Sequence, residues 1–182
     1  SLDKNSYEII VVDDGSTDNT SYALSLFTDP YNKLIKVIKN KKNQGLPYSL
    51  NKAIRSSDSE YIVRVDSDDY VNSDFLKILY LYLKFNLDSQ AICCDYFTVD
   101  DEENIISRHN SKNSPIACGL MYRREILEEI GLYNEKFLWN EDKEFRKRLD
   151  LKYNVDHINL PLYRYRRHDK NMTNNVEKMN FY

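Results

Sequence analysis

The sequence lacks the features that would place it in a membrane or on a strongly charged partner. No run approaches the roughly 20 apolar residues that a membrane span needs. The 26 Lys and Arg nearly balance the 29 Asp and Glu, which leaves a net charge of -3 and gives no global attraction to nucleic acid or to an anionic membrane. The basic residues nevertheless gather late, over 146–148 and 164–168, and this indicates a local anion site.

Cysteine is also scarce, and its spacing points to no metal or disulfide chemistry. The three cysteines are Cys93, Cys94 and Cys118, an odd number without a CxxC pair. This pattern indicates neither a disulfide framework nor a zinc site. A reducing compartment suits such a chain, so we expect a cytoplasmic location, and peripheral association with the inner face of the cytoplasmic membrane stays open.

What the chain does have is an alternation of short apolar runs with amphipathic stretches. Residues 7–12 form a nearly continuous apolar run, which is typical of a strand buried on both faces of a parallel sheet. Strands that alternate with helices indicate parallel βαβ units and therefore an α/β fold. We expect strands over 7–12, 34–38, 60–66, 90–99 and 154–160, and helices over 17–27, 47–55, 74–85, 123–130 and 143–149.

Three carboxylates follow the third apolar run. Asp66, Asp68 and Asp69 come just beyond the end of a strand, which is where open α/β sheets place their ligands. Carboxylates this close repel one another unless something compensates, and a hard divalent ion that also takes phosphate oxygens is the usual compensation. A solvated acidic turn explains the same residues without a ligand, because Asp-rich turns are common.

Two more pairs of carboxylates occupy comparable positions. Asp13 and Asp14 end the first apolar run, at the turn into a helix. Glu141 and Asp142 fall at the start of a later helix. The dipole of that helix favours negative charge at its first turn, so a structural cap explains this second pair about as well as chemistry does.

The order of these motifs along the chain resembles the family 2 glycosyltransferases of the GT-A fold. The specific part is the combination of Asp-Asp-Gly-Ser-Thr-Asp at 13–18 with Asp-Ser-Asp-Asp at 66–69. The resemblance implies a Rossmann-like α/β sandwich with a mostly parallel central sheet. It is carried by residues 10–18, 43–45, 51–53, 61–69, Gly131 with Phe137, 141–142 and 165–168.

The resemblance implies that the donor and a metal ion meet at Asp68. It assigns Asp68 and His168 to Mn2+ or Mg2+, and Arg166 to the diphosphate, because a guanidinium suits bidentate phosphate contact. A divalent ion between a carboxylate and the phosphate oxygens stabilises a departing diphosphate. Asp69 is expected to support the same site.

The nucleoside is assigned to three other carboxylates. Asp14 matches the position that hydrogen-bonds the nucleobase, and a carboxylate can accept the imide N–H of uracil. Asp13 lies beside it, although turn formation explains Asp13 better. By resemblance, Asp66 lies near the ribose or in the outer shell of the metal.

The acceptor side follows from Asp142, which matches the catalytic base of the family. A single base opposite the leaving group implies in-line displacement with inversion. Glu141 could instead orient the acceptor. The small residues over 114–119 allow close approach of a ligand or of another backbone, so Cys118 and Gly119, with Trp139, are expected in the acceptor or sugar pocket.

The sequence departs from the family at its start. Relatives begin with an apolar strand, a turn and a helix, whereas this sequence opens at Ser1, beyond most of that unit. We expect a single catalytic domain over 1–182 that lacks the first strand of the family, with residues 161–182 as a tail folding over the active site. If the chain is complete, a partner or a rearrangement must fill the gap in the sheet.

The predicted function is therefore metal-dependent, inverting transfer of a hexosyl or N-acetylhexosaminyl group from a nucleotide-sugar, most simply a UDP-sugar. The acceptor would be a glycan or a lipid-linked molecule in cell-surface polysaccharide biosynthesis. A nucleotidyltransferase and a noncatalytic nucleotide-sugar-binding module remain as alternatives, and homodimerisation stays open.

Overall fold

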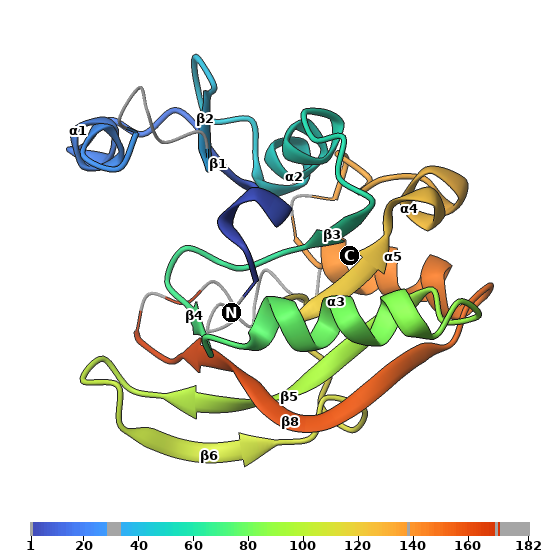
Figure 1. Ribbon diagram of the computed structural model, residues 1–182. Helices are drawn as coiled ribbons and strands as arrows, with labels where there is room; N and C mark the ends of the chain where they lie inside the picture. Colours follow the sequence, from blue (N-terminus) through green and yellow to red (C-terminus); the bar gives the residue numbers. More distant parts are fainter. Residues whose placement is uncertain (1, 29–33, 138, 170, 172–182) are drawn as a thin grey trace.

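A computed structural model describes residues 2–28, 34–137, 139–169 and 171 of the chain. It forms two sheets flanked by helices (Figure 1). The elements are η1 (Lys4–Ser6), β1 (Ile9–Asp13), α1 (Thr20–Ser25), β2 (Ile35–Lys39), α2 (Leu46–Arg55), β3 (Tyr61–Val63), β4 (Tyr70–Val71), α3 (Phe75–Phe85), β5 (Ala91–Val99), β6 (Ile105–His109), β7 (Leu120–Arg123), α4 (Arg124–Ile130), α5 (Glu141–Asp150) and β8 (Val155–Arg166).

The larger sheet has six strands in the order β3-β7-β5-β8-β4, with β6 paired to β5. Pairing of β5 with β8 is parallel, and β3 runs in the same direction, while β7, β6 and β4 run against them. The predicted α/β alternation is confirmed, and the sheet is mixed because β4, β6 and β7 each pair antiparallel with their neighbours. The sequence signal did not single out β4 or β7, which are too short to show a periodicity.

Strand β8 is longer than the sequence indicates. Its expected end at Leu160 was set by Pro161, yet the strand continues to Arg166. The pairing with β5 shifts register on both sides of Asp95, and Pro161 falls at this irregularity, where a missing N–H is tolerated. Residues 161–166 are therefore part of the sheet. Residues 170 and 172–182 of the expected tail lie outside the described residues.

The sheet has an apolar core on each face. Alternate residues of β5 face opposite sides, so Cys93 packs with Phe145 and Leu149 of α5, whereas Ile92 packs with the α3 face that contains Phe75. These side chains are almost completely buried. Burying a large apolar side chain contributes about 1.5–3 kcal/mol, so the two clusters hold the sheet and its helices together.

The two-stranded parallel sheet of β1 and β2, with α1 and α2, forms a separate N-terminal unit that we define as residues 9–55. A cavity of about 530 Å³ lies between β1 and β3, with Ile10 and Val63 among its lining residues. Helix α2 bridges the two parts, because Ile54 joins the core cluster that contains Phe145. In the described part of the chain, no helix combines the length and apolar character needed to cross a bilayer.

Candidate active site

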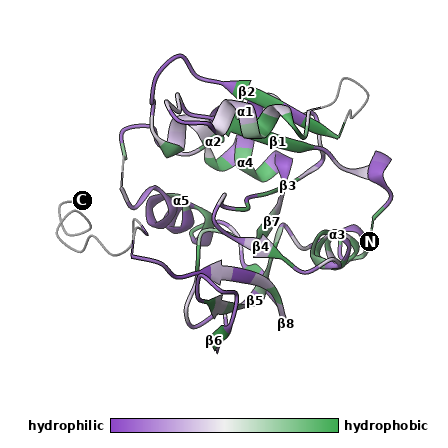
Figure 2. Ribbon diagram, turned by 90° about the vertical axis from the view of Figure 1, so that its left-hand side faces the viewer, coloured by the Kyte–Doolittle hydropathy of each residue, from purple (hydrophilic) through white to green (hydrophobic). Residues whose placement is uncertain are grey.

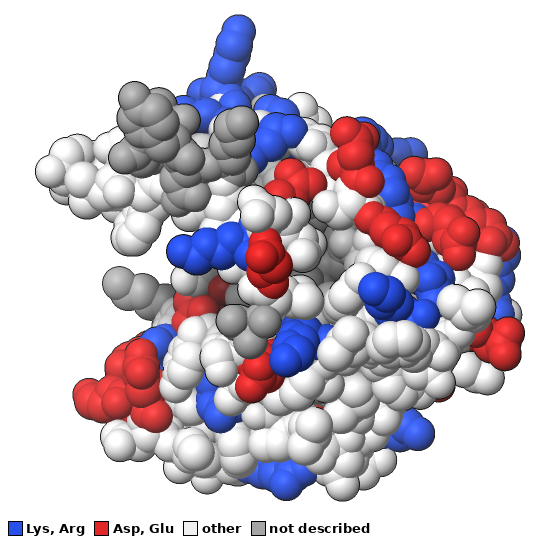
Figure 3. Space-filling model, in the orientation of Figure 1, with Lys and Arg blue, Asp and Glu red and all other residues white. Residues whose placement is uncertain are grey.

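The acidic ends of the strands lie beside a hollow in the molecular surface. Figure 3 shows the hollow between the N-terminal unit and the part of the large sheet formed by β4, β5 and β6, with acidic side chains around it. The loop after β3 and the end of β8 meet here, because β4 pairs with β8 through Tyr70 and Arg164. This pairing brings the loop that contains residues 66–69 next to residues 164–168.

Asp68 and His168 are the clearest example. The His168 Nε2 lies 3.1 Å from Asp68 Oδ2, although 100 residues separate them in the chain. The Asp68 carboxylate is 41% exposed and the His168 ring 22% exposed, so both remain accessible to a ligand. Asn171 approaches the same carboxylate oxygen, at 3.5 Å. The structure thus places the two predicted metal ligands next to each other.

Asp69 connects the loop after β3 to β8. Its carboxylate accepts hydrogen bonds from the Tyr163 hydroxyl (2.7 Å) and from the Arg166 backbone N–H (2.8 Å). Burial raises the pKa of Asp69 to about 6, in spite of these two donors. Its contacts fit the expected supporting role, because they fix the position of the loop that carries Asp68.

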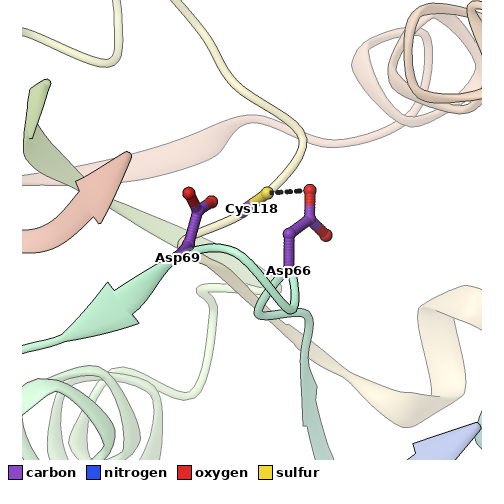
Figure 4. A group of neighbouring side chains, drawn as sticks. All are labelled: Asp66, Asp69 and Cys118. Atoms are coloured by element: carbon purple, nitrogen blue, oxygen red, sulfur yellow. Dashed lines mark hydrogen bonds between the residues drawn. The ribbon is translucent and has the colours of Figure 1, made fainter. Parts of the chain in front are cut away.

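Asp66 is bound to a buried arginine. Arg64 Nε and a terminal nitrogen of its guanidinium donate to the two Asp66 carboxylate oxygens, at 2.6 and 3.0 Å. The Cys118 thiol donates to the same carboxylate at 3.0 Å. Figure 4 shows Asp66 and Asp69 projecting to the same side of the loop, with the Cys118 sulfur between them. These contacts hold the Asp66 carboxylate beside Arg64 and Cys118, and its place near the ribose or the metal stays a prediction.

Arg64 also connects this loop to α5. Its other terminal nitrogen lies 3.4 Å from Glu141 Oε1, and both side chains are about nine-tenths buried. Burial raises the pKa of Glu141, and Arg64 opposes that rise. Burial disfavours the charge of Arg64, yet Asp66 outweighs it and raises the pKa of Arg64, which stays cationic. One guanidinium therefore fixes α5 relative to the loop.

Asp142 is the second residue of α5 and is half-buried. It borders a groove of about 540 Å³ along the helix. The residue before the helix, Asn140, has φ 57 and makes no side-chain cap. Glu141 is held by Arg64, and the role of Asp142 as the catalytic base stays a prediction. Trp139, half-buried, lies just ahead of this turn.

Asp13 and Asp14 lie in the N-terminal unit, and their hydrogen bonds are to other residues of that unit. Asp13 is buried and accepts from the Ser16 backbone N–H at 2.8 Å, and its hydrogen bonds with Ser16 hold its pKa at about 2. Asp14 accepts from Asn40 and from the backbone of the turn at 44–45, at 2.7 to 2.9 Å. These contacts fix the turn after β1, and the base-reading role of Asp14 stays a prediction.

Arg166 is already engaged by the β5–β6 connection. Its guanidinium donates to the Asp101 carbonyl at 2.9 Å and pairs with Glu103 at 3.2 Å, while Nε donates to the Asp68 carbonyl at 2.9 Å. A diphosphate contact by Arg166 stays a prediction. Arg167 beside it is exposed.

Gly119 and Cys118 are buried. Their small size allows other side chains of the protein to approach closely, namely the Tyr163 ring at Gly119 and the Asp66 carboxylate at Cys118. Gly119 has φ +71, and a Cβ there would lie 3.3 Å from the Tyr163 ring. Burial raises the pKa of the Cys118 thiol well above its ordinary value. These two residues shape the floor beneath Asp66, and their place in a sugar or acceptor pocket stays a prediction.

The residues near Asp68 fit a divalent cation better than a second cluster does. Asp68 offers an exposed carboxylate oxygen, which suits Mn2+ and Mg2+, and the His168 imidazole lies beside it as a nitrogen donor. Ligand atoms of Asp66, Asp69 and Cys118 also lie within 4.8 Å of one another. That group includes a soft sulfur and a carboxylate already paired with Arg64, so it suits a hard ion less well.

Two residues of this site were missed by the sequence reasoning. Arg64 could have been found, because a charged residue inside the apolar run 61–65 needs a partner when it is buried. Tyr163 donates to Asp69 and accepts from the Asp66 backbone N–H at 3.2 Å. No sequence signal marks Tyr163 among the 15 tyrosines.

Comparison with known proteins identifies the family. The sequence model described as Glycosyl transferase family 2 matches residues 1–169. The cholesterol galactosyltransferase of Borreliella burgdorferi is 29% identical over 161 residues, which cover 84% of this chain and 43% of that protein. The poly(ribitol-phosphate) beta-glucosyltransferase of Bacillus spizizenii is 41% identical over 86 residues, which cover 47% of this chain and 13% of that protein. The chain thus spans less than half the length of these curated relatives.

Solved structures give the same fold. Staphylococcus aureus TarS 1-349 in complex with UDP-GlcNAc has a TM-score of 0.76 at 22% identity, over 95% of this chain and 53% of that one. A mannosyltransferase from Pyrobaculum calidifontis in complex with GDP-Man and Mn2+ has a TM-score of 0.72 at 18% identity, over 93% of this chain and 50% of that one. The predicted GT-A fold is confirmed. With its family motifs in order and its fold matched, this chain belongs to glycosyl transferase family 2.

Proposed function

We propose that this chain carries a metal-dependent, inverting glycosyltransferase site, which moves a sugar from a nucleotide-sugar donor to a glycan or lipid-linked acceptor. The observation that carries the proposal is the 3.1 Å distance between His168 Nε2 and Asp68 Oδ2. It brings the basic motif at 165–168 next to the acidic motif at 66–69. A carboxylate oxygen of Asp68 and a ring nitrogen of His168 therefore lie side by side, and both side chains are accessible.

The relatives support a nucleoside diphosphate sugar as donor. TarS has been solved with UDP and with UDP-GlcNAc, and the mannosyltransferase with GDP-Man and Mn2+. Two curated relatives are named for transfer to poly(ribitol-phosphate). We extend these properties to this chain as a UDP-hexose or UDP-N-acetylhexosamine donor and an acceptor of the cell surface, reached from the cytoplasmic side.

In the proposed mechanism, Lewis-acid stabilisation of the departing diphosphate would come from a divalent ion. Asp68 and His168 would hold the ion, and Asp69 keeps their loop in place through Tyr163 and the Arg166 backbone. Asp142 takes the proton from the acceptor hydroxyl as that oxygen attacks the anomeric carbon. Because Asp142 lies in the first turn of α5, the helix dipole favours its charged, basic form.

The metal half of the proposal is tested by Asp68→Asn. Calorimetric titration of UDP in the presence of Mn2+ should show saturable binding that EDTA removes, and Asp68→Asn should abolish the metal-dependent part. Asp58→Asn is the matched control, because Asp58 is exposed ahead of β3. Equal UDP binding with Mn2+ and with EDTA in the unchanged chain would contradict a metal-held diphosphate.

The catalytic half is tested by Asp142→Asn. Loss of a general base typically slows a reaction by about 10²- to 10⁴-fold, and we expect this loss in UDP release with UDP affinity unchanged. Glu141→Gln serves as the comparison, since Arg64 holds that carboxylate. Full activity of Asp142→Asn would remove Asp142 from the mechanism, and release of pyrophosphate in place of UDP would indicate nucleotidyl transfer.

A further inference from the structure

The groove beside α5 has a carboxylate at one end and basic side chains along its length. Asp142 lies at the start of the helix, and the groove continues along it to Leu151. Residues 115–117 of the β6–β7 connection line it as well. Leu120 and Phe145, both buried, are among its apolar lining residues. A volume of about 540 Å³ falls within the range of pockets that hold a small ligand, roughly 300–1,000 Å³.

Positive charge gathers on the same groove. Lys143, Arg146 and Lys147 all line it. Arg146 is neutralised by Asp150 through a 2.7 Å contact. Lys143 and Lys147 are exposed, and in the described part of the chain neither has a recorded carboxylate partner. Helix α5 is mostly hydrophilic along its length (Figure 2).

The two lysines are one helical turn apart, so they lie on the same face of α5. Like charges at this spacing destabilise a helix. An anion bound between them would relieve this repulsion. With a rise of about 1.5 Å per residue, Lys147 stands about 7.5 Å along the helix axis from Asp142.

We propose that this groove is the acceptor subsite and that it selects an acceptor chain with an anionic group, a phosphate or a carboxylate. The attacked hydroxyl lies at Asp142, and the anion lies at Lys143 and Lys147. This inference rests on the proposed glycosyl transfer, because it takes Asp142 as the base. The groove is concave and has apolar residues in its lining, so it fits a chain segment better than the flat surface of a bilayer.

The test uses nuclear magnetic resonance of the whole chain, with UDP and Mg2+ present so that the donor site is filled. Glycerol 1-phosphate is titrated as the anionic probe, and glycerol as its neutral match. We expect saturable shifts of backbone amides in residues 115–117 and 142–151 with glycerol 1-phosphate and none with glycerol. Shifts that are absent, equal for both probes, or confined to residues 164–169 would overturn the proposal.

Charge-removing variants sharpen the test. Lys143→Gln and Lys147→Gln should each weaken the probe by about three- to fivefold, the effect of one exposed ion pair. Lys77→Gln, an exposed lysine on α3, is the matched control and should leave the affinity unchanged. An equal loss in all three variants would show that only the net charge matters and would overturn the proposal.

The outcomes separate this inference from the proposed function. If UDP binds with neither Mn2+ nor Mg2+, the donor site itself is refuted, whatever the probe does at α5. If UDP binds and the probe does not, only the anionic acceptor subsite is refuted. Lysine-dependent sedimentation with phosphatidylglycerol vesicles, without shifts from glycerol 1-phosphate, would overturn it in favour of a membrane surface.

Discussion

The N-terminal unit and the rest of the molecule are held together by different kinds of contact. In residues 9–55 the buried side chains are mainly polar, and in residues 60–166 they are mainly apolar. Both parts leave some large apolar side chains on the surface, among them Tyr22 and Phe27 in the N-terminal unit and Phe85 and Leu151 in the rest. In the six-stranded part, Phe75, Leu79, Leu83, Leu149 and Tyr163 are fully buried.

This difference separates positioning from stability. Hydrogen-bonded networks such as those of Asp13 and Asp14 fix the direction of a few groups, but each bond contributes only about 0.5–1.5 kcal/mol net. Apolar burial is less directional and accumulates over many side chains. The six-stranded part should therefore set the global stability, and the N-terminal unit should open first.

The largest effect on stability is expected in the apolar core. Phe145 is buried and stacks on Tyr133 at 4.5 Å between ring centroids. Phe145→Ala should lower the free energy of unfolding by about 3–5 kcal/mol, through lost burial and the cavity left behind. Urea denaturation measures it, with Phe85→Ala, 75% exposed, as the control that should change little. Similar losses for both variants would contradict the assigned core.

A medium effect is expected where the two parts join. Asn51 of α2 accepts from the Tyr133 backbone N–H (2.9 Å) and donates to the Tyr133 carbonyl (2.8 Å). Asn51→Ala leaves these buried groups without partners and should cost about 1–3 kcal/mol. Asn113→Ala, at an exposed turn, is the control.

The same variant tests the comparison directly. In Asn51→Ala, hydrogen exchange of the β1 and β2 amides should accelerate more than exchange of the β5 amides, because α2 connects the N-terminal unit to the core. Uniform acceleration across all strands would mean that the two parts unfold as one and that their different interiors have no consequence for opening.

The smallest effect is a pH dependence located in the N-terminal unit. The pKa of Asp13 is about 2 in the folded chain, below its ordinary 3.8, because Ser16 donates to its carboxylate. The stabilisation from this ionisation is complete above about pH 4 and is lost as the pH falls towards 2. Unfolding midpoints measured over this range should fall less steeply for Asp13→Asn. Parallel pH profiles for both proteins would contradict the low pKa.

Much of the fold followed from local patterns. The apolar runs that became β1, β2 and β5 and the helical spacing of α3 were sufficient to predict the α/β class. The carboxylates at the strand ends indicated where the candidate site lies, since strand ends in such sheets share an edge. What local patterns could not show was the pairing of short strands, because β4 and β7 are defined only by their partners.

The site was predictable as a set of residues but less so as a network. Asp68 and His168 are brought together as expected, whereas the contacts of Arg64 with Asp66 and Glu141 depend on how α5 packs against the loop after β3. The engagement of Arg166 with the 101–103 connection likewise depends on a hairpin whose geometry the sequence does not specify. Tertiary packing decides both.

The irregular pairing around Pro161 determines which face of the sheet the later side chains of β8 occupy. From Cys94 to Tyr96, β5 advances by two residues, while β8 advances by five, from Ile158 to Tyr163. An odd extra length turns the following side chains to the opposite face, so it is what directs Tyr163 into the core cluster beneath Asp66. Deleting a single residue at 159–160 would invert the alternation and point Tyr163 away from both aspartates. The alignment of the site thus depends on the number of residues in β8 around Pro161.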